Sequence, residues 1–180
     1  MDLGCGRGRH AIFFANSGFD VSAMDLSFDC VKELSEFAEK ENLSIQCDVA
    51  EMTSLPYQDD SFDCLIAYHV ISHSNRAWVE QVLKEIRRVV RKDGEAFVTF
   101  GSSKTLENIP NHWEILERNV IIKHEYGPED GVPHFYPDAE DILMLLKDFQ
   151  ILQTRHSQNV ELASGIWKGF HFFLSLKVVK

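Results

Sequence analysis

The order of hydrophobic and polar positions along the chain predicts alternating helices and strands. Residues 11–15 form an apolar helical stretch that ends in a turn at 16–18, and residues 20–26 follow as a buried strand. Ser27 can cap a second helix, whose apolar positions recur at helical spacing, and residues 43–47 resume extended character. This alternation is typical of a mainly parallel sheet with helices on its faces.

The middle of the chain repeats the pattern with its strongest helix. An apolar run at 62–68 predicts a strand that is covered on both faces. The helix that follows is expected to stop at residues 92–94, before another strand at 95–100. Its predicted buried stripe consists of Trp78, Val82, Ile86, Val89 and Val90.

Residues 101–137 interrupt this rhythm. They hold four of the five prolines and no long periodic pattern, and connections of this length are usually functional lids or disordered segments. We therefore predict a lid at about 101–137, inserted into a single domain over residues 1–180. A last helix is expected at 138–146, and strands at 149–155 and 169–179. The final strand alternates apolar with other residues, as an antiparallel member of a mixed sheet would.

Composition and charge narrow the classes of protein. Hydrophobic residues make up 44% of the 180 positions and charged residues 26%, which fits one globular domain with a sizeable core. The net charge of −10 repels a phosphate backbone, so we expect no nucleic-acid partner, whereas a cationic ligand is compatible with it. No apolar run approaches the roughly 20 residues that cross a bilayer, so we expect no membrane partner and a cytoplasmic location.

Cysteines and histidines give no evident metal site. The four cysteines lie far apart without a C-x-x-C pair, which predicts free thiols. Cys5 has only Arg7 and Arg9 as basic neighbours, so it is expected to be a small loop residue rather than a nucleophile. His69 and His73 are four residues apart, but no third ligand is evident, so we expect no metal site.

A glycine-rich segment stands where a strand would turn into the first helix. Gly4, Gly6 and Gly8 let the backbone approach a ligand without side-chain obstruction. Residues 6–11 also satisfy the G-x-G-x-x-A form of the dinucleotide-binding pattern, so a nicotinamide-dependent oxidoreductase is one alternative. Asp2 favours S-adenosylmethionine instead, because its carboxylate suits a sulfonium or amino group and would repel a pyrophosphate.

Further acids follow the next two strands. Asp25 ends the second strand and can accept hydrogen bonds from a ribose diol, a role that both cofactors require. Asp48, followed by Val49, ends the third strand, and an acid there suits an adenine amino group. The pair Leu55-Pro56 then leads to the segment 60–63, which opens the fourth strand.

The whole series resembles the class I methyltransferases, and within them the small-molecule branch described as type 11 or tellurite-resistance-like. The resemblance implies a Rossmann-like, doubly wound α/β/α fold with a mixed sheet, S-adenosylmethionine as cofactor and a small molecule as methyl acceptor. In that resemblance Leu26 packs on the adenine, and Tyr68 with His69 lies below the methionine moiety. The residues that it assigns to the cofactor are Asp2, Gly4, Cys5, Gly6, Gly8, Asp25, Leu26, Asp48, Val49, Tyr68 and His69.

Family members usually carry a helix and a full first strand ahead of this motif, whereas here only Met1 precedes Asp2. We therefore expect a truncated first strand and hypothesise that added upstream residues would tighten cofactor binding, since covering elements exclude water. A relative that binds the cofactor without turnover is a further alternative, because the motif can persist without catalysis.

Methyl transfer is a displacement at carbon in which alignment supplies most of the rate, and only a protonated acceptor needs a general base. No catalytic residue is therefore predicted. His73 after the fourth strand, together with His134 and Tyr136 in the predicted lid, is expected to border the acceptor pocket. The pattern identifies neither the acceptor nor the oligomeric state.

Overall fold

The computed structural model has alternating helices and strands, and its described part comprises residues 1–124, 127, 129–161 and 166–180. The helices in this part are α1 (Arg9–Asn16), α2 (Phe28–Glu41), α3 (Arg76–Val89) and α4 (Ala139–Leu145), with a 3-10 helix at Ser103–Asn108. The main-sheet strands are β1 (Asp2–Leu3), β2 (Val21–Asp25), β3 (Ile45–Val49), β4 (Phe62–Ala67), β5 (Val90–Gly101), β9 (Phe149–Glu161) and β10 (Ile166–Val178).

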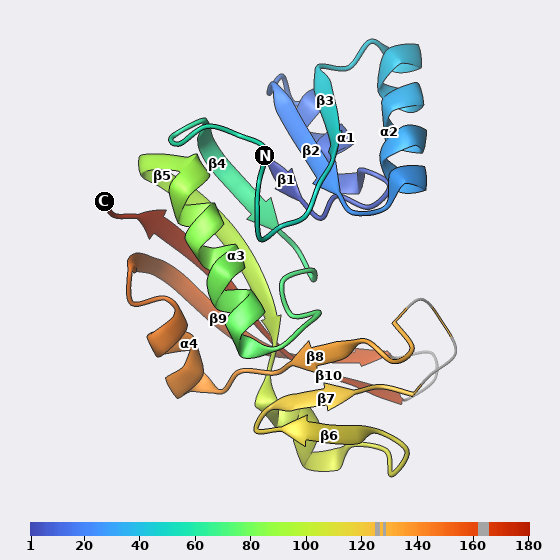
Figure 1. Ribbon diagram of the computed structural model, residues 1–180, viewed down its shortest axis with the longest axis vertical. Helices are drawn as coiled ribbons and strands as arrows, with labels where there is room; N and C mark the ends of the chain where they lie inside the picture. Colours follow the sequence, from blue (N-terminus) through green and yellow to red (C-terminus); the bar gives the residue numbers. More distant parts are fainter. Residues whose placement is uncertain (125–126, 128, 162–165) are drawn as a thin grey trace.

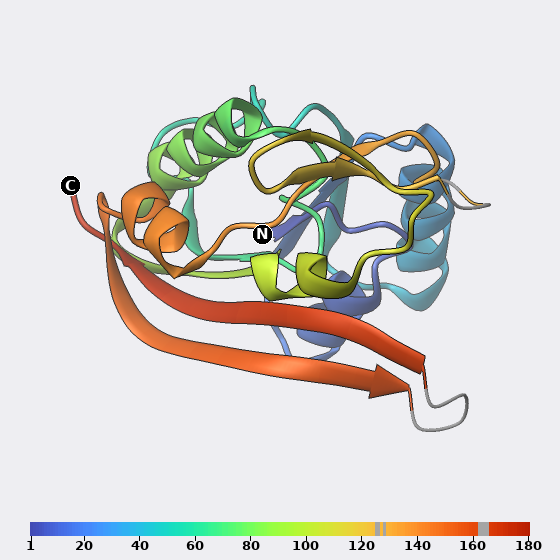
Figure 2. The same ribbon diagram turned by 90° about the horizontal axis from the view of Figure 1, so that it is seen from below.

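Among the described residues, the main sheet has seven strands in the order β3-β2-β1-β4-β5-β10-β9. The first five pair in parallel and β10 runs antiparallel to β5, so the mixed Rossmann-like sheet predicted from the sequence is confirmed. Helices α3 and α4 lie on the same side of this sheet (Figure 2). The strand order reverses between β1 and β4, and ligands of such sheets bind beyond the carboxyl ends of the strands at this reversal.

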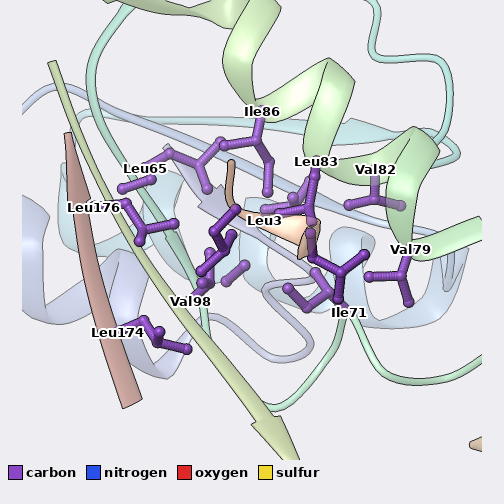
Figure 3. Close-up of a cluster of buried hydrophobic side chains, with 14 of the residues drawn as sticks. Leu3, Leu65, Ile71, Val79, Val82, Leu83, Ile86, Val98, Leu174 and Leu176 are labelled. Atoms are coloured by element: carbon purple, nitrogen blue, oxygen red, sulfur yellow. The ribbon is translucent and has the colours of Figure 1, made fainter. Parts of the chain in front are cut away.

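The core forms where α3 packs on the centre of the sheet (Figure 3). Val79, Val82 and Ile86 of α3 are fully buried, and Figure 3 shows them against side chains of the central strands such as Leu3 and Val98. Burying a side chain of this size contributes about 1.5–3 kcal/mol. The predicted stripe is therefore confirmed at Val82, Ile86 and Val89. Val90 is buried but follows the helix, Trp78 is only partly buried, and Val79 is fully buried as well.

Helix α3 ends earlier than its sequence predicts. The expected stop at 92–94 is wrong, because Val90 already pairs with Phe62 of β4 and so begins β5. Asp93 adopts a φ of 63°, and the register of the β4–β5 pair shifts between Phe62 and Cys64. Residues 90–94 therefore belong to an irregular strand start rather than to a helix end.

The inserted span 101–137 has regular structure of its own. Its strands β6 (Glu114–Glu117), β7 (Val120–Ile122) and β8 (Pro133–Phe135) pair into a small antiparallel sheet. Figure 1 shows this sheet beyond the carboxyl end of β5. Residues 125, 126 and 128 of the span lie outside the described residues. The absence of a periodic pattern did not mean absence of strands, because strands this short are too brief to show periodicity.

The last two strands form a hairpin that is longer than predicted at its free end, since β9 and β10 contain 13 residues each. Phe172, Leu174, Leu176 and Val178 are buried, as the alternation in β10 predicts. Within the described residues, no helix combines the length and the apolar character needed to cross a membrane.

Candidate functional site

The glycine-rich loop after β1 lies at the carboxyl edge of the sheet. Gly4, Gly6 and Gly8 have φ values of 71°, 52° and 81°, in the left-handed region that side chains disfavour. A Cβ atom on Gly4 would lie 2.7 Å from Met52 and Val70, and one on Gly8 would collide with Leu34. A Cβ on Gly6 would meet nothing within 4 Å. Gly6 is therefore the point of the loop where a ligand has room to approach the backbone.

Asp25 connects this loop to the start of α2. Its Oδ2 accepts a 2.8 Å hydrogen bond from the Gly6 N–H, and its Oδ1 accepts a 2.9 Å bond from the Ser27 N–H. The Gly4 and Cys5 N–H groups both donate to the Met24 carbonyl, at 2.8 and 2.9 Å. An ionised carboxylate has about four acceptor sites, so Asp25 can hold the loop and still accept bonds from a ligand.

Asp2 lies beneath the loop rather than on its surface. Its side chain is 2% exposed, and Oδ2 accepts a 3.0 Å hydrogen bond from the Ala11 N–H in the first turn of α1. Burial raises the pKa of Asp2, while His10 opposes that effect. One carboxylate oxygen thus positions α1, and the predicted attraction of Asp2 for a positively charged cofactor stays a prediction.

Two exposed apolar side chains follow β2 and β3. Asp25 pairs with Val49 in the β2–β3 register, and Leu26 comes next in the chain. Leu26 is 66% exposed and Val49 49% exposed, so both leave apolar surface available to a planar ring. Asp48 lies next to them, and its Oδ2 accepts hydrogen bonds from Tyr57 (2.9 Å) and Gln46 (3.1 Å).

Cys5 is held in the same loop as a neutral thiol. Burial, followed by the negative charges of Asp2 and Asp25, raises the pKa of Cys5 to about 12. A thiol with such a pKa is protonated at neutral pH and is a poor nucleophile, in keeping with the expectation that Cys5 is a loop residue.

A second part of the site is a pocket of about 350 Å³ beyond the ends of β4 and β5. Four of the eight histidines line it, and all three predicted acceptor-pocket residues lie in its wall. Their role toward an acceptor stays a prediction. The lining residues are His69, Ser72, His73, Thr99, Gly101, Lys123, Glu129, His134, Tyr136 and His171.

The four histidines form two pairs. The backbone N–H of His69 donates to Thr99 Oγ1 at 2.7 Å, and the His69 ring lies 4.7 Å from the His171 ring and 4.3 Å from Tyr68. The His73 ring lies 4.8 Å from that of His134. Residues 69–73 are not helical, so His69 and His73 turn to different partners.

Glu129 is a third residue whose side chain could bind a metal ion together with His73 and His134, and the sequence pattern did not reveal it. Its Oε1 lies 3.7 Å from His73 Nε2, and its Oε2 lies 3.1 Å from His134 Nε2. The structure thus brings a third potential ligand group close to His73, while the expectation of no metal site stays a prediction. The sequence did not single out Glu129, Lys123 or His171, because their approach to His73 depends on how segments distant in the chain pack.

Burial makes the pocket unfavourable for charged imidazoles. It lowers the pKa of His73, with His134 adding to the effect, and that of His134, with Lys123 adding to the effect. The pKa of His171 falls to about 4, through burial and then through His69. Burial opposes ionisation of Glu129, but Lys123 and the two histidines lower the Glu129 pKa overall. At neutral pH the pocket therefore presents neutral imidazoles beside one carboxylate and one ammonium.

Another cavity, of about 270 Å³, lies near the amino ends of the strands, next to Met1 and Val21. Its wall is largely apolar and includes Phe14, Phe19 and Phe97. It lacks the convergent polar groups of the histidine pocket and lies at the opposite edge from the glycine-rich loop, so we do not assign the chemistry to it.

The fold is that of a doubly wound α/β protein whose glycine-rich loop lies at the switch point of the sheet. Residues 1–98 match the methyltransferase domain family, and the chain belongs to this family. It is 26% identical over 136 residues to the probable S-adenosyl-L-methionine-dependent methyltransferase TehB of Haemophilus influenzae, covering 66% of this chain and 47% of TehB. The chain spans about half the length of the curated relatives it matches.

Solved structures of low identity share the fold. A SAM-dependent methyltransferase from Methanosarcina mazei has a TM-score of 0.79 at 18% identity, covering 99% of this chain and 91% of that one. The 1,6-didemethyltoxoflavin-N1-methyltransferase of Burkholderia thailandensis, solved with 1,6-didemethyltoxoflavin and S-adenosylhomocysteine, has a TM-score of 0.73 at 15% identity. That comparison covers 99% of this chain and 70% of the Burkholderia protein.

Proposed function

We propose that this chain binds S-adenosylmethionine at the glycine-rich loop and transfers its methyl group to a small molecule in the histidine pocket. The observation that carries the proposal is the continuity of the two parts: the loop and the pocket lie at the same carboxyl edge of the sheet. His69 lines the pocket, and the ring of its chain neighbour Tyr68 lies 5.1 Å from that of His10 in the first turn of α1, which follows the glycine-rich loop. Membership of the methyltransferase domain family supports the proposal and gives no support to a nicotinamide-dependent oxidoreductase.

The residues present fit the proposed cofactor. Gly6 leaves open space for close approach, Asp25 has acceptor capacity for a ribose diol, and Leu26 with Val49 offers apolar surface to an adenine. Asp48 is available for the adenine amino group, and the carboxylates of Asp2 and Asp25 favour a cation over a pyrophosphate. When bound, S-adenosylmethionine supplies a methyl group on a positively charged sulfur.

The histidine pocket suits a small acceptor. Its volume of about 350 Å³ lies at the lower end of the range for small-molecule sites. The neutral imidazoles of His69 and His171 can accept a proton from a hydroxyl, amine or thiol acceptor, which an imidazolium cannot. His73, His134 and Tyr136 line the same wall and are proposed to contact the acceptor.

Two organisational features belong to this proposal. The inserted span 101–137 acts as a lid over the acceptor within a single domain; its β8 strand is tied to the main domain by the Phe135 N–H, which donates to the Ser72 carbonyl at 2.9 Å. The protein works in the cytoplasm, in keeping with four free cysteines.

Calorimetry with S-adenosylmethionine, S-adenosylhomocysteine and NAD tests the cofactor assignment. We expect saturable binding of the first two and none of NAD; binding of NAD alone would overturn the proposal. Release of S-adenosylhomocysteine across a panel of small acceptors then separates an enzyme from a silent binder. Binding without release on every acceptor would favour the silent relative.

A further inference from the structure

The donor atoms of His73, Glu129 and His134 all lie within 4.8 Å of one another among the described residues. Two ligand atoms on one metal ion, each bonded at about 2.1 Å, are themselves about 3–3.5 Å apart. The measured separations of 3.1 Å (His134 to Glu129) and 3.7 Å (His73 to Glu129) are close to this spacing. Small side-chain adjustments would bring all three onto one ion.

His134 has the surroundings of a metal ligand. Its side chain is almost fully buried, and its Nδ1 lies 2.8 Å from the Val132 carbonyl oxygen, which can only accept a hydrogen bond. Nδ1 therefore carries the ring proton. In a neutral ring the Nε2 lone pair then points at the Glu129 carboxylate, 3.1 Å away, where two acceptors would face each other. A proton or a metal ion shared by Nε2 and the carboxylate resolves this conflict, and ligating histidines typically donate their other N–H in this way.

The backbone holds the three ligands in register. The Phe135 N–H donates to the Ser72 carbonyl at 2.9 Å, which places His134 beside His73. The Val132 N–H donates to the Glu129 carbonyl at 3.1 Å and closes the turn that carries the carboxylate toward His134. Ser72 Oγ is buried in the same wall and, within the part of the chain that the structure describes, has no hydrogen-bond partner.

We propose that His73, Glu129 and His134 bind one divalent transition-metal ion in the wall of the acceptor pocket. Two imidazoles and one carboxylate suit Zn²⁺, Co²⁺ or Fe²⁺, and three protein ligands leave coordination positions open toward the pocket. These positions select acceptors that carry a ligating oxygen, nitrogen or sulfur atom. The site itself rests on side-chain geometry and not on the proposed function, so each can fail without the other.

Lys123 is the feature that opposes a metal ion. Its Nζ lies 3.6 Å from Glu129 Oε2, on the side of the carboxylate that faces His134. An ammonium at this distance repels a second cation. The Lys123→Met variant removes this charge and retains the long apolar stem, so it should bind the metal several-fold more tightly than the wild-type chain.

The test is a titration of the chelator-treated whole chain with Co²⁺, followed by visible absorption, and with Zn²⁺ by calorimetry, both without cofactor. We expect one ion per chain and the absorption bands of imidazole-bound Co²⁺. His134→Gln and Glu129→Gln should each weaken binding by about tenfold or more, since even residues behind the ligands change metal affinity tenfold to a hundredfold. His112→Gln is the matched control, because His112 is exposed and lies outside the pocket lining.

Thermal melts of the metal-free variants check folding, and Glu129→Gln keeps the test decisive if the buried His134 proves necessary for stability. Absence of binding to the folded wild-type chain would overturn the proposal. Equal binding by Glu129→Gln and wild type would overturn it as well, since the ion would then sit on surface histidines. In either case the 3.1 Å contact between His134 and Glu129 would be a hydrogen bond without a metal ion.

Discussion

The glycine-rich loop and the histidine pocket share one edge of the sheet but are built in different ways. The loop region is local: Asp2 and Asp25 lie within one β-α-β unit, and their carboxylates accept hydrogen bonds from the Ala11 and Gly6 N–H groups of the same unit. The pocket instead joins side chains from separate segments, from His69 to His171. The first region is rich in negative charge, whereas the second holds neutral imidazoles. Under the proposed function, cofactor binding therefore depends on a short motif and acceptor recognition on long-range packing.

The largest expected effect tests whether Gly8 is required for packing and Gly6 for ligand binding. Gly8→Ala should lower the free energy of unfolding by about 3 kcal/mol, because it adds a left-handed side chain and a collision with Leu34. Gly6→Ala should cost about 1–2 kcal/mol, since only its φ of 52° is unfavourable, and should weaken S-adenosylhomocysteine binding. Urea unfolding and calorimetry measure both. Equal losses of stability would contradict this division.

Asp25 should control affinity more than any other acid of the loop region. Asp25→Ala removes two hydrogen bonds to a charged acceptor, each contributing about 1.5–3 kcal/mol, and leaves the Gly6 and Ser27 N–H groups unpaired. Part of this loss lowers the free energy of unfolding. We expect calorimetry to show that S-adenosylhomocysteine binds about tenfold to a hundredfold more weakly. Asp29→Ala, an exposed acid in the first turn of α2, is the control and should bind normally.

The Asp2→Asn variant tests whether Asp2 carries a buried charge beneath the loop. Asp2→Asn keeps an oxygen that can accept from the Ala11 N–H but removes the buried charge. Burial raises the pKa of Asp2 above 3.8, so its stabilisation is complete below pH 3.8 and is lost as the pH rises through the folded-state pKa. Stability of the variant relative to wild type should therefore increase across that window in urea melts. A difference that does not change with pH would refute the assignment of a buried charge.

Affinity supplies the second readout for Asp2. If the charge also attracts the cofactor, Asp2→Asn should weaken binding of cationic S-adenosylmethionine more than that of uncharged-sulfur S-adenosylhomocysteine, by a few-fold. Equal changes for the two ligands would restrict Asp2 to positioning α1.

The smallest effect concerns the pocket. Burial and then His69 lower the pKa of His171 to about 4, so the folded protein resists protonation that the unfolded chain accepts. The corresponding stability is present above pH 6.5 and is lost as the pH falls toward 4. In His171→Gln the fall in melting temperature between pH 6.5 and about 4 should be smaller by a few degrees than in wild type. His112→Gln should show the same fall as wild type. An unchanged dependence of melting temperature on pH in His171→Gln would contradict the lowered pKa of His171.

The sequence predicted the helices and strands of the main sheet well where their signals are local. Ser27 caps α2 through its side chain, which accepts from the Cys30 N–H, and the alternation in β10 matches its buried positions. The end of α3 was misplaced, because pairing of Val90 with Phe62 is a tertiary contact that helix signals do not contain. The strands of the inserted span were missed for a similar reason, since each is stabilised by its neighbours rather than by its own pattern.

What the sequence by itself determined is the chemistry that needs only neighbours: glycines where the backbone must turn, acids at the ends of consecutive strands, and apolar residues at the period of each element. Only the tertiary structure decided which histidines meet, that Glu129 joins His73 and His134, and that His171 closes the pocket beside His69. The physical reason is that these interactions act over different distances along the chain. Hydrogen bonding and periodicity act within a few residues of the chain, whereas a pocket wall depends on how distant segments pack, and no local pattern specifies that packing.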